Sequence, residues 1–518
     1  MTTLTGANLV AGEERTTGPP TIESIDPRSQ EVREVRAHEA TSAEVAAACE
    51  RAAEAAEEVA RWTPGERAGL LRRIADDLDA EGGRIVALAD SETGLGAHPR
   101  LEGELERTTG QLRFLAEVVE DGAWLEVMID RQDDGPTIRR MLRPLGPVSV
   151  FGASNFPLAF SVAGGDTAAA LGVGCPVVVK AHPSHPLTSE LVGRLVSRSI
   201  EEADAPPGAF SLVHGFRAGE QVVDDPRIRA VAFTGSFAGG TAIADRAARR
   251  DRPISVYAEM GSLNPIVITP ETARTRPADT AEGFVGSMTL GTGQFCTKPG
   301  LLFIPSGAAE LETAIVERLR AQDPAPMLNA GLLGAWEDGV RRWASLDELE
   351  VLIPLEPVEE GGTWVRPALV AATAERFILS DVLHDECFGP VAIIVRYDDR
   401  ADLVAALRSV PGTLAAGVHG SPDDELAVEL VGVLSENAGR VVWNGWPTGV
   451  AVVWSMHHGG PYPATTAPLH TSVGAAALRR FLRPVAYQGV PEELLPPPVR
   501  DDNPWRLPRR VDGELLLP

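Results

Sequence analysis

Lysine is almost absent from this sequence. Lys180 and Lys298 are the two lysines of the 518-residue chain, and all other members of its 47 basic residues are arginines. Acidic residues outnumber basic ones, which gives a formal net charge of −26. This charge disfavours binding to polyphosphates and anionic lipids, so we expect neither a nucleic acid nor a membrane as partner. General surface acidity that promotes solubility explains the charge equally well.

Cysteine and long apolar runs are scarce as well. Cys49, Cys175, Cys296 and Cys387 lie far apart, without a C-x-x-C pair or a Cys/His metal spacing. We therefore predict no metal site and thiols that act singly. No apolar run reaches the roughly 18 residues that a membrane span requires. The first 20 residues lack the basic-then-apolar order of a signal peptide. Together these absences predict a reduced, cytoplasmic protein.

The order of helical and strand patterns predicts an α/β fold with two doubly wound parallel sheets. The first third is helical, with capping boxes at Thr41/Glu44 and Thr63/Glu66. From residue 147, short β-branched runs alternate with helical segments, in one series to about residue 260 and in a second to about residue 445. A polar hairpin over 129–146 looks too hydrophilic for a core strand, so we expect it to project and pair with another subunit.

Several chemically active residue types follow the predicted strands, where such sheets bind ligands. Asn155 lies just beyond "VSVFGAS"; its amide suits a developing oxyanion, although an ordinary turn is the commoner role. Lys180 is the last residue of "PVVVK". Its compact charge suits a contact with a ribose or phosphate, although a lysine at a strand end is more often simply exposed to solvent. Glu259 ends "ISVYAE", where burial predicts a raised pKa that suits a general base.

Two further segments complete this series. In "FTGSFAGG", Gly235 and Gly240 flank the start of a predicted helix, whose free backbone N–H groups suit a pyrophosphate. This segment contains neither the G-x-G-x-x-G motif nor a Walker motif. In "GQFCTKPG", polar neighbours favour a reactive Cys296 over the commoner buried structural thiol. Lys298 either lowers the pKa of this thiol electrostatically or is exposed to solvent.

The motifs "SNFP", "VVVKAHP", "AFTGS", "AEMGS", "GQFCT" and "ECFGP" occur in this order and resemble the aldehyde dehydrogenase superfamily over nearly the whole chain. The resemblance implies that Cys296 attacks an aldehyde. The Asn155 amide and the backbone N–H of Cys296 would hold the oxyanion, and a hydride would pass to NAD(P). Glu259 would then activate water to hydrolyse the thioester.

The same resemblance implies a set of cofactor-binding residues: Lys180, Gly235, Ser236, Gly240, Glu386 and Phe388. Many NAD-preferring members carry a glutamate three residues after the lysine, where this chain has Pro183. Proline neither accepts a bond from the ribose 2′-hydroxyl nor repels a 2′-phosphate. Ser184 and Arg217 are candidate partners for that phosphate. We therefore expect NADP to be preferred, with NAD still usable.

The segments "AHPSHPLTSELV" and "HHGGPYPATTAPLHTSVGAAALRRFLRPVAYQ" resemble the branch that oxidises 2-oxoglutarate semialdehyde (2,5-dioxopentanoate) to 2-oxoglutarate. The alternative branch acts on medium- or long-chain fatty aldehydes. The candidate substrate residues are Arg100, Arg107, Phe156 and Pro463. Each arginine would pair with the substrate carboxylate, or else serve at the surface or a helix interface. Trp454 and Met456, in a segment that departs from the branch pattern, would reshape the pocket.

Three other functions compete with this interpretation. The first is a CoA-acylating enzyme, but such enzymes generally lack the counterpart of Glu259. The second is a hydrolase that uses Cys296 without a cofactor, but it would leave the first sheet without a function. The third is a non-catalytic binding protein, which would not need Cys296. The resemblance implies an NAD(P)-binding domain (1–128 and 147–265), a catalytic domain (266–480), an oligomerisation arm (129–146 and 481–500) and an extended tail (501–518). It also implies a homodimer or homotetramer that takes a small aldehyde as substrate.

Overall fold

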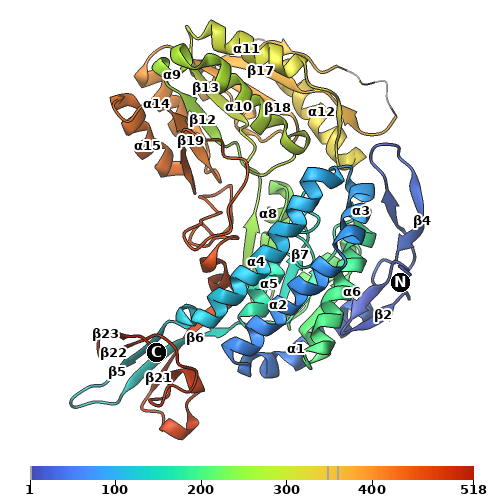
Figure 1. Ribbon diagram of the computed structural model, residues 1–518, viewed down its shortest axis with the longest axis vertical. Coiled ribbons are helices and arrows are strands. Elements are labelled where there is room, and N and C mark those ends of the chain that lie inside the picture. Colours follow the sequence, from blue (N-terminus) through green and yellow to red (C-terminus); the bar gives the residue numbers. More distant parts are fainter. Residues whose placement is uncertain (1–2, 347–348, 357, 359–360) are drawn as a thin grey trace.

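The computed structural model describes residues 3–346, 349–356, 358 and 361–518, which form two α/β lobes and a projecting β arm (Figure 1). This confirms the predicted fold class. Among the described residues, no helix combines the length and the apolar character needed to cross a lipid bilayer.

The sheet of the first lobe has the strand order β11-β10-β7-β8-β9-β1-β2. Its strands are β1 (Asn8–Val10), β2 (Glu13–Arg15), β7 (Val148–Phe151), β8 (Val177–Lys180), β9 (Phe210–Val213), β10 (Ala230–Thr234) and β11 (Ser255–Glu259). Strands β7 to β11 are parallel, and β1 and β2 add antiparallel at one edge. The order reverses between β7 and β10, which is where doubly wound sheets bind ligands.

Helices cover both faces of this sheet because side chains alternate along each strand. Val177 and Val179 of β8 share one apolar cluster with α2, α4, α5 and α6, whereas Val178 packs with α1 and α7. The helices of this lobe are α1 (Ser42–Arg61), α2 (Pro64–Ala80), α3 (Gly82–Thr93), α4 (Glu102–Asp121), α5 (Gly165–Gly172), α6 (Pro186–Glu202), α7 (Phe216–Asp224) and α8 (Phe237–Ala248). Both predicted capping boxes, at the starts of α1 and α2, are confirmed.

The second lobe repeats this plan with the strand order β15-β17-β18-β13-β12-β19-β20. Its strands are β12 (Pro265–Ile268), β13 (Leu301–Pro305), β15 (Glu350–Ile353), β17 (Ala368–Thr373), β18 (Val391–Tyr397), β19 (Ala416–His419) and β20 (Val441–Trp443). Its helices are α9 (Pro270–Thr275), α10 (Pro277–Thr289), α11 (Ala309–Arg320), α12 (Ala330–Ala344), α13 (Ala374–Leu379), α14 (Arg400–Ser409) and α15 (Glu425–Asn437). Helices α10 and α11 cover one face, and α12 to α15 pack in the cluster on the other. Two-stranded sheets β3–β4 (Ile22–Ile25, Val32–Ala37) and β14–β16 (Ala325–Pro326, Trp364–Val365) lie outside both main sheets.

The arm contains the predicted hairpin, as β5 (Val127–Asp130) and β6 (Ile138–Pro144), with β21 (Leu482–Gln488) paired to β6. The C-terminal residues differ from the predicted extended tail. They form a second hairpin, β22 (Arg509–Val511) and β23 (Glu514–Leu516), whose first strand joins β5 in parallel. An ion pair between Arg131 and Asp512 (Nη1 to Oδ2, 2.9 Å) holds the two hairpins together.

The segment before β21 packs differently from its predicted place in the second domain. Residues 464–466 run beside β11, where Met260 N donates to Ala464 O (2.8 Å) and Thr466 N to Ala258 O (3.1 Å). Farther along, Leu478 and Phe481 are buried in the core of the first lobe. The sequence predicted that residues 266–480 form one catalytic domain. The last part of this region instead returns to the first lobe.

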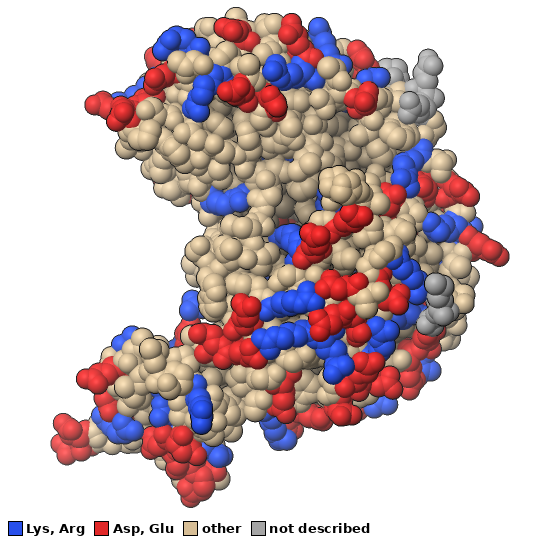
Figure 2. Space-filling view, viewed as in Figure 1, with Lys and Arg blue, Asp and Glu red and all other residues tan. Residues whose placement is uncertain are grey.

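Charge is distributed unevenly over the surface. Figure 2 shows acidic and basic side chains intermingled over the helices of the first lobe, whereas the hollow between the two lobes is lined mostly by uncharged side chains.

Candidate active site

A cavity of about 710 Å³ lies beyond the carboxyl ends of β7, β8 and β10, at the reversal of strand order. Four of the predicted cofactor-binding residues line it: Lys180, Ser184, Gly235 and Ser236. Aromatic walls come from Phe151, Phe216 and Phe233. A cavity with aromatic walls and a small number of polar groups has the character of a cofactor site.

Lys180 is the last residue of β8, and its ammonium group has no hydrogen-bond or ion-pair partner among the described residues. Burial lowers its pKa to about 8. Ser236 is the N-cap residue of α8, and its Oγ accepts from Gly239 N at 3.1 Å. An unpaired cation and a helix start in one cavity fit the ribose and phosphates of a dinucleotide.

Other predicted cofactor residues lie elsewhere. Arg217 is exposed and does not line this cavity; Arg246 does, but it is paired with Glu220 and Asp224. Gly240 is required for packing, because a Cβ there would lie 2.5 Å from Met260 Sδ. Glu386 and Phe388 also lie outside the lining, in the loop before β18.

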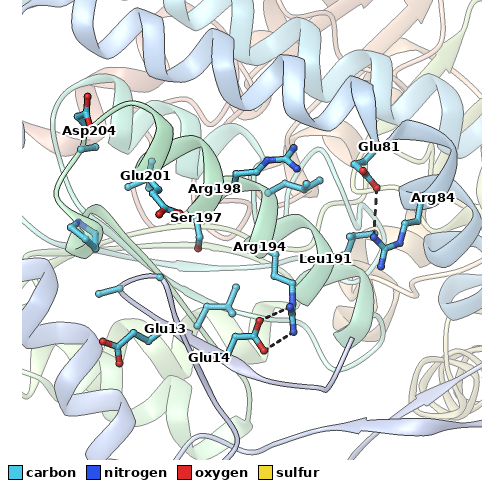
Figure 3. A pocket seen from close by; sticks show the side chains of 17 residues that line it. Glu13, Glu14, Glu81, Arg84, Leu191, Arg194, Ser197, Arg198, Glu201 and Asp204 are labelled. Atoms are coloured by element: carbon cyan, nitrogen blue, oxygen red, sulfur yellow. Dashed lines mark hydrogen bonds and ion pairs between the residues drawn. The ribbon is translucent and has the colours of Figure 1, made fainter. Parts of the chain in front are cut away.

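A larger cavity of about 920 Å³ lies between the β1–β2 hairpin and α6, and it is lined by many charges (Figure 3). Its Arg194 is paired with Glu14 (2.5 Å) and Glu190 (2.6 Å), and its Arg198 with Asp77 (2.7 Å). Paired arginines leave no free cation for an anionic ligand.

Residues 294–298, the nucleophile segment named for the predicted nucleophile Cys296, follow a left-handed turn at Gly291, Thr292 and Gly293. A Cβ on Gly293 would lie 2.4 Å from Gly389 O, so only glycine allows this segment to approach the loop that carries Glu386. Asn264 fixes the next residues, because its Nδ2 donates to Cys296 O (2.8 Å) and Lys298 O (2.9 Å). The sequence interpretation missed Asn264, although it stands five residues after Glu259.

Lys298 is buried, with an exposed fraction of 3%, so the alternative of solvent exposure is wrong. Its Nζ donates to Cys387 O (2.9 Å), Gly389 O (3.1 Å) and Val391 O (2.7 Å). The electrostatic alternative fails as well, because burial and the Glu259 carboxylate raise the pKa of the Cys296 thiol well above its ordinary value. Lys298 instead ties the nucleophile segment to the loop of Glu386.

That loop presents Glu386 toward the end of β11. Its Oε1 accepts from Ser262 N at 3.1 Å, and a Cβ on Gly261 would lie 2.3 Å from Oε2. Burial raises the pKa of Glu386, while the Ser262 bond and the Lys298 charge oppose this rise. Glu386 is therefore held between the two lobes, close to both the nucleophile segment and β11.

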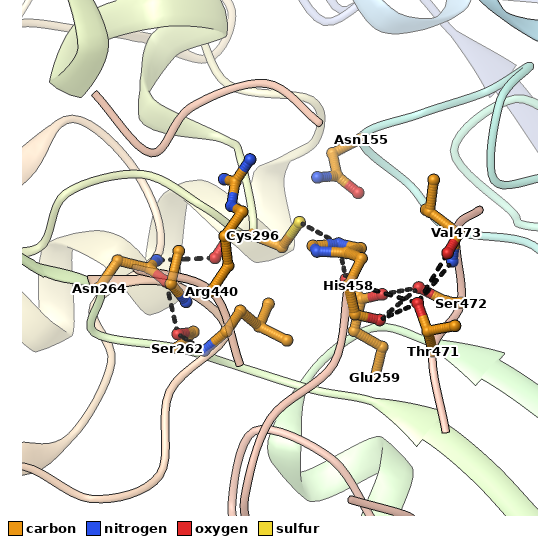
Figure 4. Close-up of polar contacts among 12 residues, drawn as sticks. Asn155, Glu259, Ser262, Asn264, Cys296, Arg440, His458, Thr471, Ser472 and Val473 are labelled. Carbon is orange, nitrogen blue, oxygen red and sulfur yellow. Dashed lines mark hydrogen bonds and ion pairs between the residues drawn. The ribbon is translucent and has the colours of Figure 1, made fainter. Parts of the chain in front are cut away.

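Cys296, Glu259 and His458 converge at the centre of the site (Figure 4). The Cys296 Sγ lies 3.6 Å from His458 Nε2, which lies 2.9 Å from Glu259 Oε1. The other oxygen of Glu259 accepts from Ser472 Oγ at 2.6 Å. His458 was missed from the sequence, where the unusual pair "HHGG" was its only signal. Trp454 and Met456, expected to reshape the pocket, do not line the cavity around Cys296.

The predicted rise in the pKa of Glu259 is also wrong. Burial does raise it, but the His458 imidazole, the Ser472 hydroxyl and Cys296 outweigh burial and lower the pKa below its ordinary value. Glu259 is therefore ionised at neutral pH and can accept a proton from water.

Asn155 lies in the same site and is buried, with its Nδ2 donating to Gln294 O at 2.9 Å. Glu104 of α4 holds this loop, because its Oε1 accepts from Leu158 N and Ala159 N, each at 2.9 Å. The backbone N–H of Cys296 has no acceptor among the described residues. A free N–H beside an oriented amide is the arrangement that stabilises an oxyanion.

A second, smaller cavity of about 330 Å³ contains Cys296 and His458. Three of the predicted substrate residues line it: Arg100, Arg107 and Phe156. Pro463 does not, because its loop runs beside β11 instead. Arg100 is already bound by Glu104 Oε2 (2.5 Å) and Asn155 O (3.0 Å). Among the described residues Arg107 forms no ion pair, and its buried Nη1 has no hydrogen-bond acceptor.

The fold and site define a two-lobed α/β protein in which a cysteine, a carboxylate and an imidazole meet beside a cofactor-sized cavity. Residues 14–462 match the model of the aldehyde dehydrogenase family. Two relatives are similar over almost their full lengths. Alpha-ketoglutaric semialdehyde dehydrogenase 2 of Azospirillum brasilense is 42% identical, over 99% of each chain. Alpha-ketoglutaric semialdehyde dehydrogenase of Acinetobacter baylyi is 40% identical, over 98% of each.

The crystal structure of 1-pyrroline-5-carboxylate dehydrogenase from Thermus with bound NAD has the same fold, with a TM-score of 0.81. It is 22% identical, and the match covers 93% of this chain and 92% of that one. The chain belongs to the aldehyde dehydrogenase family, as its motifs indicated, and it is an NAD(P)-dependent aldehyde dehydrogenase.

We expect Lys298→Met to lower the free energy of unfolding by about 3 kcal/mol, because it leaves three buried carbonyls without their donor. Lys180→Met is the matched control, since Lys180 makes no such bonds, and it should change stability little while weakening cofactor binding. Urea denaturation of both variants checks this. Equal destabilisation by the two substitutions would contradict the assigned role of Lys298.

The raised pKa of Cys296 predicts little thiolate at neutral pH and more as the pH rises. In cofactor-free protein, the rate of Cys296 alkylation by iodoacetamide should increase about tenfold per pH unit from about pH 6 to about pH 9. Peptide mass spectrometry at each pH measures this rate. A plateau reached below neutral pH would mean that the pKa of this thiol is lowered.

Proposed function

We propose that this enzyme oxidises 2-oxoglutarate semialdehyde to 2-oxoglutarate, with NADP preferred and NAD usable. The names of the two full-length relatives support this substrate. The observation in the molecule that carries the proposal is the unpaired Arg107 guanidinium in the cavity of Cys296.

Arg107 is suited to a short dicarbonyl acid. Its guanidinium carbon lies 5.0 Å from the ring centre of Phe160, and burial lowers the pKa of Arg107 without neutralising it. A buried, unpaired arginine gains most from a carboxylate that makes charge-assisted hydrogen bonds. Arg100 has the same type of aromatic contact, 4.5 Å from the centre of Phe156, but its charge is already paired. The two arginines thus have different roles: Arg107 binds substrate, and Arg100 supports Asn155.

The chemistry follows from the positions of the side chains. Cys296 Sγ adds to the aldehyde carbon, and its proton passes to solvent through the cavity that Cys296 lines. The Asn155 amide and the Cys296 N–H stabilise the oxyanion. NAD(P), which would be held by Lys180 and Ser236 in the 710 Å³ cavity and by Glu386 beside it, supplies a hydride acceptor when bound. Glu259 then takes a proton from the water that hydrolyses the Cys296 thioester.

The preference for NADP rests on Pro183, which lines the cofactor cavity together with Ser184. Ser184 Oγ accepts from Asn329 Nδ2 at 2.9 Å, which leaves its own O–H free to donate to a phosphate. Arg217 is exposed at the start of α7, so it binds the 2′-phosphate only if it turns toward the cavity.

We also propose that the arm joins subunits into a homodimer or homotetramer. Strand β21 pairs with β6 on one side, and among the described residues its other edge has no partner (Figure 1). Such an edge accepts a strand or loop of a second copy. The free cysteines of the described chain accord with a cytoplasmic location.

Arg107→Met should raise KM for 2-oxoglutarate semialdehyde by about 10- to 100-fold, because a charge-assisted hydrogen bond is worth roughly 1.5–3 kcal/mol. The kcat/KM for hexanal, which has no carboxylate, should change little. Arg113→Met is the control on the exposed side of the same helix, α4. Equal losses with both aldehydes would contradict the carboxylate contact, and a wild-type preference for hexanal would favour the fatty-aldehyde branch.

Pro183→Glu should lower kcat/KM for NADP by at least about tenfold, because a carboxylate repels the 2′-phosphate by more than roughly 1.4 kcal/mol. Pro183→Gln, of similar size but neutral, should have a smaller effect. Initial rates with both cofactors measure this. A wild-type preference of tenfold or more for NAD would refute the proposed selectivity.

A further inference from the structure

The catalytic centre combines three types of metal ligand in a very small space. Glu259 Oε1, Cys296 Sγ and His458 Nε2 all lie within 4.8 Å of one another. They come from three separate segments: the end of β11, the loop before β13 and the loop between β20 and β21. The sequence spacing of cysteines and histidines gave no sign of this group.

The sulfur–nitrogen distance fits a tetrahedral ion. Zinc bonds of about 2.3 Å to sulfur and 2.0 Å to nitrogen place the two ligand atoms about 3.5 Å apart. The observed Sγ–Nε2 distance is 3.6 Å. The Nε2–Oε1 distance of 2.9 Å would need to open by a few tenths of an ångström.

The carboxylate of Glu259 is oriented toward the other two ligand atoms. Glu259 is 4% exposed, and the partner of its Oε1 is the His458 imidazole, with Nε2 at 2.9 Å. Its other oxygen is fixed by Ser472. One oxygen of this carboxylate is thus fixed by a hydrogen bond, and the other faces a thiol and an imidazole. Metal-binding carboxylates are commonly oriented by such a hydrogen bond to a neighbouring side chain.

We propose that Glu259, Cys296 and His458 bind Zn²⁺ and that this ion reversibly switches the dehydrogenase off. The inhibition rests on the proposed role of Cys296 as nucleophile. Zn²⁺ displaces the Sγ proton to solvent and forms a zinc–thiolate bond, so that the sulfur lone pair no longer attacks the aldehyde. The thiolate, imidazole and carboxylate donors select zinc over magnesium, which prefers oxygen ligands. The fourth position faces the 330 Å³ cavity, where water completes the tetrahedron.

Direct binding is tested on tag-free, cofactor-free protein without substrate, so that it does not depend on the proposed function. Co²⁺ serves as the spectroscopic probe. We expect a thiolate-to-cobalt charge-transfer band and the intense visible bands of a tetrahedral ion, at one ion per chain, removed by added Zn²⁺. His458→Gln should abolish these bands. His457→Gln, the adjacent histidine outside the trio, should retain them. Absence of the bands from the unaltered enzyme would overturn the site.

Inhibition is tested by initial rates and by thiol protection. Zn²⁺ should inhibit the enzyme, EDTA should restore it, and Mg²⁺ should have no effect. Zn²⁺ should also slow alkylation of Cys296 at least about tenfold in the unaltered and His457→Gln proteins, and much less in His458→Gln. Equal protection in His458→Gln would mean that the thiol alone binds the metal and would overturn the trio. Cobalt bands without inhibition would keep the metal site and refute instead the role of Cys296 as nucleophile.

Discussion

The active site depends on one buried cation. The ammonium group of Lys298 satisfies three backbone carbonyls of the loop over residues 387–391, and Asn264 binds the backbone of Cys296 and Lys298 from the opposite side. Removing a charge from water is costly, and these bonds compensate for it only in a single geometry. The nucleophile and the loop of Glu386 are therefore fixed relative to each other before any ligand binds.

Around this fixed segment, the first lobe contributes the remaining groups from the ends of its strands. Lys180 and Glu259 end β8 and β11, and Asn155 follows β7. Parallel strands bring their carboxyl ends to one edge, so residues separated by more than a hundred positions meet there. The loop between β20 and β21 then crosses over this edge with His458 and Ser472, which lower the pKa of the Glu259 carboxyl despite its burial.

Electrostatic pairing decides which similar side chains are available for chemistry. Arg100 and Arg107 lie on one side of the same cavity, each over an aromatic ring. Glu104 neutralises Arg100 and at the same time holds the loop of Asn155, which leaves Arg107 as the free cation. The same reasoning applies to the large cavity beside α6, whose many charges are already paired with one another. Free charge, more than cavity size, distinguishes the proposed substrate site.

The sequence alone determined the two alternating α/β series, the capped helices, the projecting hairpin, and Cys296, Glu259 and Asn155 as candidates, because local periodicity and strand ends are visible in the order of residues. It did not reveal His458, Asn264, the burial of Lys298, the C-terminal hairpin or the direction of the Glu259 pKa shift. Each of these depends on contacts between segments far apart in the chain. Burial, pairing and hydrogen-bond partners exist only once those segments meet, and for that reason only the tertiary structure decided them.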